Sequence, residues 1–197
     1  MIDDKHTEKE ILQNPDTVEY SVPAELILQE FRRCGVTDVV TVPDYVTLSV
    51  HNLLLSGYLN AVRVIECCSE DEAVAVSAGL YITGRSPVVI MQNQGLYASM
   101  NNIRSIGLEA RIPVVLIVGQ WGREISNYGK NPKESKRLVV RGTERLLEAC
   151  DIVYFRLETS GDVSVIGCAF EAARKYSGPA AVLVGTPTQW ARAVNSD

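Results

Sequence analysis

The sequence predicts one α/β domain, with a doubly wound, mainly parallel sheet of six strands and helices on both faces. Six short segments are continuous runs rich in Val, Ile and Leu, which is typical of strands buried on both faces. Helical segments separate these runs, as in βαβ units. The length of 197 residues fits one domain, and a hydrophobic content of 46% is enough for one core.

Prolines and glycines mark where the elements begin and end. Pro23 stands at a first helical position and Gly35 lies just past the end of the same helix. Pro87 and Pro113 each open an apolar strand. The predicted strands are 38–42, 60–66, 87–92, 113–119, 152–157 and 179–184. The predicted helices are 23–33, 46–55, 71–81, 95–109, 143–150 and 160–176.

The remaining segments are polar. Residues 1–20 are expected to form an N-terminal arm, 21–187 the domain, and 188–197 a C-terminal tail. Residues 120–142 are polar and rich in glycine, so they are predicted to form a long loop. Long loops in compact domains are usually functional or mobile.

Composition argues against several classes of protein. The net charge of -5 disfavours a nucleic-acid partner, and no apolar run has the roughly 18 residues of a membrane helix. The N-terminus is polar and acidic, unlike a secretory signal. The five cysteines fit no metal-binding spacing and indicate reduced thiols in a cytoplasmic protein. We therefore expect no nucleic acid, no membrane and no metal ligands in this chain.

Ligands of open parallel sheets bind beyond the carboxyl ends of the strands. In this chain the rule selects four loops, at 42–45, 66–71, 92–95 and 119–124. All four carry polar or turn-forming residues. We expect them to lie along one edge of the sheet.

The second of these loops carries three consecutive acids before an apolar helix. Ser69 and Glu72 have the spacing of a capping box, with Ser69 as N-cap. Acidic residues in a first helical turn also suit the helix dipole. The cap requires Ser69 and Glu72 but not Glu70, so a structural and a functional interpretation of this loop are compatible.

The other loops allow structural interpretations as well. The turn from Gln92 to Gly95 is either a plain strand-to-helix turn or an anion-binding helix N-terminus. Neither of the glycine-rich phosphate-loop patterns occurs in the chain. Asp44 either caps the helix that follows it or reaches a site at the edge. Arg123 and Glu124 have the character of a solvated ion pair.

Four segments together resemble a known family. In order they read VPDY, SEDEAVAVSAGLYITG, SPVVIMQNQGL and IPVVLIVG. They resemble the pyrimidine-binding domain of thiamine-diphosphate-dependent 2-oxoacid decarboxylases, especially phosphonopyruvate decarboxylases and the separate α subunit of sulfopyruvate decarboxylases. The resemblance covers roughly residues 20–187. It implies that Glu70 is catalytic: its carboxyl group hydrogen-bonds a ring nitrogen of the aminopyrimidine and promotes deprotonation of the thiazolium carbon that attacks a 2-keto group.

The resemblance also implies the remaining site residues. The cofactor would be flanked by Pro43, Glu70, Gln92, Asn93, Gly95 and Leu96. The substrate pocket would contain Asp44, Tyr45, Gln94 and Tyr97. Three of the pocket residues, Tyr45, Gln94 and Tyr97, replace smaller residues that are usual in the family. Larger side chains at the pocket edge change which substrate fits, so a 2-oxo acid larger than the family's small substrates stays among the alternatives.

The family pattern for the diphosphate and Mg²⁺ site begins with G-D-G, and this sequence contains none. The resemblance therefore implies that a β subunit with the diphosphate-binding domain holds the diphosphate of thiamine diphosphate and the Mg²⁺, as an α2β2 assembly. Three alternatives stay open at this stage. They are a carboligase subunit, a non-catalytic regulatory subunit of the same fold, and an unrelated nucleotide-binding domain.

Overall fold

The structure, a computed structural model, describes residues 20–189. The predicted arm and tail lie outside these residues, except for residues 20, 188 and 189. Within the described part, one sheet has the strand order β2-β1-β3-β4-β6-β5, and every neighbouring pair is parallel. The strands are β1 Asp38–Thr41, β2 Arg63–Glu66, β3 Pro87–Gln92, β4 Val114–Gly119, β5 Val153–Leu157 and β6 Pro179–Val184. The predicted doubly wound sheet is confirmed.

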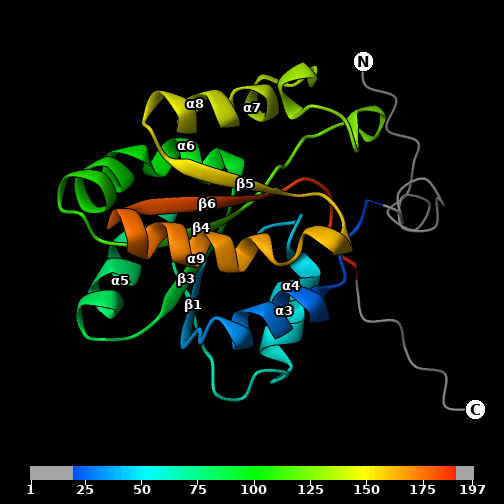
Figure 1. Cartoon of the computed structure of the whole chain (residues 1–197). Helices are drawn as coiled ribbons and strands as arrows, with labels where there is room; N and C mark the ends of the chain where they lie inside the picture. Colours follow the sequence, from blue (N-terminus) through cyan, green and yellow to red (C-terminus); the bar gives the residue numbers. More distant parts are fainter. Residues whose placement is uncertain (1–19, 190–197) are drawn as a thin grey trace, which may run out of the picture.

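Helices cover both faces of the sheet (Figure 1). One face packs against α3, α4 and α9, and the other against α5, α6 and α8. The chain runs from β1 to the edge strand β2 and then returns past β1 to β3. Because crossovers in parallel sheets are right-handed, this reversal requires the connecting helix to change face. The helices are α3 Ala24–Arg33, α4 Leu48–Leu55, α5 Glu70–Ile82, α6 Asn93–Asn102, α7 Leu138–Arg141, α8 Thr143–Ala149 and α9 Val165–Tyr176.

The two hydrophobic cores explain why the strand segments are continuously apolar. Val115 and Ile117 of β4 belong to the core beneath α3, α4 and α9. Leu116 and Val118 belong to the core on the other face. Alternate side chains of a strand point to opposite faces, so a strand with two buried faces has no polar alternation.

Several predicted boundaries differ from the structure. The strand predicted at 60–66 begins only at Arg63, because the segment before it turns, with the Val62 N–H bonded to the Leu59 carbonyl at 2.9 Å. The helix predicted at 95–109 begins at Asn93 and continues as a π-helix over Ile103–Glu109.

Two further segments are more finely divided than predicted. The predicted loop at 120–142 contains two short 3₁₀ helices, Ile125–Asn127 and Pro132–Glu134, and ends in α7. The helix predicted at 160–176 is a 3₁₀ turn at Ser160–Asp162 followed by α9. No helix within residues 20–189 is long and apolar enough to cross a membrane.

Candidate active site at the carboxyl edge of the sheet

The strand order brings the four predicted loops together along one edge. The loops follow β2, β1, β3 and β4, which are consecutive neighbours about 4.8 Å apart. The connections leave β1 and β3 in opposite directions along the sheet. Such a reversal is where open α/β sheets form their ligand crevice.

Glu70 is the first residue of α5, next to the N-cap Ser69. The predicted capping box is wrong in its details, since the Ser69 side chain makes no cap hydrogen bond. Glu72 accepts a hydrogen bond from the backbone N–H of Cys68 at 2.8 Å, and not from Ser69. The Ser69 hydroxyl instead bonds Asp71 and lowers the pKa of that carboxyl group. Within residues 20–189 the Glu70 carboxylate has no hydrogen-bond or ion-pair partner.

The half-buried Glu70 side chain lies directly against Gly95 of α6. A β-carbon on Gly95 would fall inside 3.0 Å of Cγ, Cδ and Oε1 of Glu70. Gly95 is buried and has an ordinary helical backbone, so a positive φ does not explain the glycine. The space that its missing side chain leaves is occupied by Glu70. Two residues predicted separately, from different loops, therefore meet in the structure.

Asn93 connects the loop after β3 to the chain after β4. Its Nδ2 donates to the carbonyl oxygens of Trp121 at 3.1 Å and Val139 at 3.2 Å. The side chain is fully buried, and its Oδ1 has no partner among the described residues. The neighbouring Leu96 belongs to the hydrophobic core, and Gln92 is the half-buried N-cap of α6. Asn93 and Leu96 thus fix α6, on which Gly95 stands.

Asp44 is buried beneath the same edge, whereas Pro43 before it is exposed. The Asp44 carboxylate accepts hydrogen bonds from the N–H of Val46 at 3.1 Å and from the N–H and hydroxyl of Thr47 at 3.2 and 3.1 Å. Burial raises the pKa of this carboxyl group, against these hydrogen bonds, which lower it. A β-carbon on Gly119 would overlap the carboxylate, so Asp44 reaches the end of β4. These contacts fix the turn before α4, but the N-cap of that helix is Thr47, so the interpretation of Asp44 as the helix cap is wrong.

The residues predicted for the substrate pocket do not share one cavity. Tyr45 packs edge-to-face on Trp121, with ring centroids 5.2 Å apart, and lines a cavity of about 390 Å³. Gln94 and Tyr97 lie elsewhere, in an open surface hollow with Leu138 and Val139. The cavity beside Tyr45 is lined by Tyr45, Val46, Gln120, Trp121, Gly122, Arg123, Glu124, Ile125, Tyr128, Arg137, Gly185 and Pro187.

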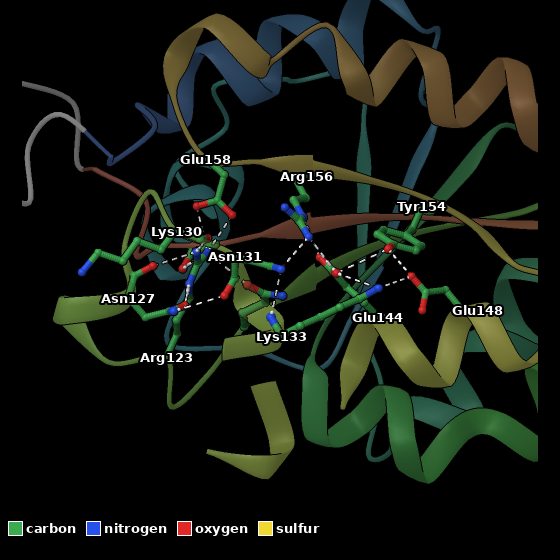
Figure 2. A network of polar contacts seen from close by, with 12 residues as sticks. Arg123, Asn127, Lys130, Asn131, Lys133, Glu144, Glu148, Tyr154, Arg156 and Glu158 are labelled. Atoms are coloured by element: carbon green, nitrogen blue, oxygen red, sulfur yellow. Dashed lines mark hydrogen bonds and ion pairs between the residues drawn. The ribbon is translucent and has the colours of Figure 1, made fainter. Parts of the chain in front are cut away.

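The stretch after β4 is fixed by a buried arginine (Figure 2). The guanidinium of Arg123 pairs with Glu158, beyond β5, at 2.7 Å. It also donates to Oδ1 and the carbonyl oxygen of Asn127, the carbonyl of Lys130 and Oε1 of Gln120. The prediction that Arg123 and Glu124 form a solvated pair is wrong, because the Arg123 side chain is buried and its acid lies 35 positions along the chain.

A second group of ion pairs extends this network toward α8. Arg156 of β5 donates to both carboxylate oxygens of Glu144, at 2.6 and 2.8 Å, and to Asn131 at 3.0 Å. Figure 2 shows these side chains as one continuous row from Arg123 to Glu148. The predicted loop is therefore held against β5 by charged hydrogen bonds.

Sequence reasoning did not single out Gln120, Trp121, Tyr128 or Arg137 as site residues. Gln120 and Trp121 directly follow β4, so the strand-end rule already applied to them. No sequence pattern marks Tyr128 and Arg137, since only the folding of residues 120–142 brings them to the cavity. Residues 20–189 contain no group of three or more His, Cys, Asp or Glu side chains that could hold a metal ion.

Comparisons with known proteins agree with this architecture. Residues 23–138 match the family described as thiamine pyrophosphate enzyme, N-terminal TPP binding domain. The α subunit of sulfopyruvate decarboxylase from Methanococcus maripaludis is 29% identical over 167 residues, covering 82% of this chain and 93% of that protein. A phosphonopyruvate decarboxylase from Streptomyces viridochromogenes is 33% identical over 71% of this chain, but the match spans only 33% of that protein.

A solved structure shares the fold at lower identity. The thiamine diphosphate-dependent 4-hydroxybenzoylformate decarboxylase of Rhodococcus jostii RHA1 superposes with a TM-score of 0.63 at 20% identity. The match covers 90% of this chain and 34% of that one. The chain thus corresponds to nearly all of one relative and to about a third of the larger ones.

Proposed function

We propose that this chain, which belongs to the thiamine pyrophosphate enzyme family, is the α subunit of a 2-oxoacid decarboxylase. In this proposal Glu70 is its catalytic acid. The observation that carries the proposal is the pair formed by Glu70 and Gly95. A carboxylate at the ligand-binding edge of a parallel sheet is held against a glycine, and no described side chain or backbone group bonds it. An unbonded, half-buried carboxylate is suited to a ligand that brings its own hydrogen-bonding atom.

The residues at this edge fit the aminopyrimidine end of thiamine diphosphate. Glu70 would hold a proton between its carboxylate and a ring nitrogen, and Gly95 keeps the carboxylate in place. Asn93 and Leu96 would hold α6 against the ring, with Pro43 and Gln92 on either side. When bound, thiamine diphosphate supplies the electron sink that lets a 2-oxo acid lose carbon dioxide.

In this proposal a second chain binds the diphosphate end of the cofactor. The relative from Methanococcus maripaludis, which this chain matches over 93% of that protein's length, is itself named as an α subunit. A β subunit would hold the diphosphate and the Mg²⁺, in an α2β2 assembly. The small 2-oxo acid would then react at the interface between the chains.

Replacing Glu70 by Gln tests the catalytic role. The amide keeps the size of the side chain and removes its acid function. We expect decarboxylation by the assembled enzyme to fall about 10²- to 10⁴-fold, the usual contribution of a positioned acid or base. Thermal unfolding should be unchanged, because Glu70 makes no bond within the described chain. Calorimetry should also show weaker binding of thiamine diphosphate.

Glu72→Gln is the matched control. It changes the same functional group in the same helical turn, and an amide oxygen can still accept the bond from the Cys68 N–H. We expect this variant to retain activity. Full activity of Glu70→Gln with the assembled enzyme would contradict the proposal and favour a regulatory subunit of the same fold.

A further inference from the structure

The cavity beside Tyr45 has room for a larger ligand than a three-carbon acid needs. Its volume is about 390 Å³, whereas an apolar cavity of about 150 Å³ already accepts benzene. Its walls include the rings of Tyr45, Trp121 and Tyr128. Burial raises the pKa of Tyr128 to about 12, so its phenol is neutral at physiological pH. The walls therefore suit a flat apolar group.

One buried amide in the cavity wall lacks a partner. Gln120 is 2% exposed, and no described residue accepts a hydrogen bond from its Nε2. The orientation of this amide is fixed by Arg123, whose guanidinium donates to Oε1 of Gln120 at 3.2 Å. A guanidinium has only donors, so the amide oxygen must face it and Nε2 must point elsewhere. This donor has essentially no accessible surface, so the amide closes the wall and does not face a ligand in the cavity.

The charges of the lining residues match a single anionic group. Three charged residues line the cavity, namely Arg123, Glu124 and Arg137. The guanidinium of Arg123 is fully used by Glu158 and five other acceptor atoms. Glu124 is anionic and bonded to the Ser135 hydroxyl and the Lys136 N–H. A second anionic group on a ligand would meet the Glu124 carboxylate.

Arg137 supplies the one cation that is not already neutralised. Its guanidinium has no hydrogen-bond or ion-pair partner within residues 20–189, and the side chain is exposed at the rim. The cavity thus offers one cation and an aromatic wall. An aryl-substituted 2-oxo acid carries one carboxylate and one flat ring.

We propose that this cavity binds the substrate of the enzyme and selects a monoanionic 2-oxo acid with an aromatic side chain. The ring lies against Tyr45 and Trp121, and the carboxylate pairs with Arg137. This inference rests on the proposed function for the reaction, but the selection of the ligand is a property of this chain alone. Asn93, which lies on the same helix as Gly95, bonds the carbonyl oxygen of the cavity residue Trp121.

Direct binding to the full chain tests the selectivity without cofactor or partner. Isothermal titration calorimetry would compare phenylpyruvate, pyruvate, which lacks the ring, and 2-oxoglutarate, which carries a second carboxylate. We expect phenylpyruvate to bind at least about tenfold more tightly than either, because only it buries a ring. Tighter binding of 2-oxoglutarate, or no preference among the three, would overturn the inference.

Two variants locate the binding. Arg137→Leu should weaken phenylpyruvate about tenfold or more, because it removes a charged hydrogen bond. Arg145→Leu makes the same change at an exposed position outside the cavity and should leave the affinity unchanged. Because Arg137 is exposed, its replacement should not disturb the fold. If Arg137→Leu and the unmodified chain bind phenylpyruvate with equal affinity, this cavity is not the binding site.

The two proposals fail in different ways. If Glu70→Gln keeps its activity but phenylpyruvate binds through Arg137, the catalytic proposal fails and the cavity assignment stands. If Glu70→Gln is inactive but phenylpyruvate does not bind the chain, only the ligand assignment is wrong.

Discussion

The variant Gly95→Ala should displace the Glu70 side chain without lowering the stability of the fold. Gly95 lies inside α6 with an ordinary helical backbone, where alanine is favoured over glycine by about 0.5–1 kcal/mol. The fold should therefore lose little or nothing from the added methyl group. The Glu70 side chain, by contrast, occupies the space that the new β-carbon requires.

The size of the displacement follows from the contacts. A β-carbon at Gly95 would lie inside 3.0 Å of Cγ, Cδ and Oε1 of Glu70, whereas carbon atoms pack at about 3.5–4.0 Å. Glu70 must then withdraw by about 1 Å or more, or change rotamer. A misplacement of about 1 Å at a reacting group can cost about 10²-fold in rate. We expect a loss of that order in kcat.

The assay is decarboxylation by the assembled enzyme, with thermal unfolding measured on the same samples. Gly79→Ala is the matched control, because Gly79 lies in α5 and a β-carbon there meets nothing within 4 Å. Both variants should unfold at the same or a higher temperature than the unmodified chain. Only Gly95→Ala should lose activity. An active Gly95→Ala enzyme would refute the view that Gly95 positions Glu70.

Two further predictions concern the stability of the scaffold. Asp38 is fully buried at the start of β1; burial would raise the pKa of its carboxyl group, but hydrogen bonds from Arg85 and Arg63 lower it overall. The stability that Asp38 contributes is thus present above about pH 4 and is lost as the pH falls through the lowered pKa. In chemical denaturation, Asp38→Asn should lower the free energy of unfolding by about 3 kcal/mol at pH 7 and make that free energy fall less steeply at acidic pH. An unchanged dependence on acidic pH would contradict this. Arg123→Met should cost about 3–5 kcal/mol, because Glu158 is left unpaired, and a cost below about 1 kcal/mol would show that this pair does not hold the stretch after β4.

The sequence predicted the sheet and the position of its ligand edge because both depend on local patterns. A run such as PVVLIVG in β4 has no polar alternation, and the carboxyl ends of parallel strands must share an edge. The contact between Glu70 and Gly95 was beyond such reasoning, although each residue was named, since it depends on how α5 packs against α6. The pairing of Arg123 with Glu158 was missed because the neighbouring Glu124 offered a local partner, whereas the true partner lies 35 positions away.

Asn93 links the two parts of the site. Both hydrogens of its amide are used by carbonyl oxygens of the stretch after β4, those of Trp121 and Val139. Gly95 stands two positions later on the same helix and leaves the space that the Glu70 side chain occupies. Trp121 forms the aromatic wall of the cavity with Tyr45. Because a fully buried amide loses much by breaking these bonds, the wall that would contact the substrate and the helix that positions the proposed catalytic acid are held as one unit.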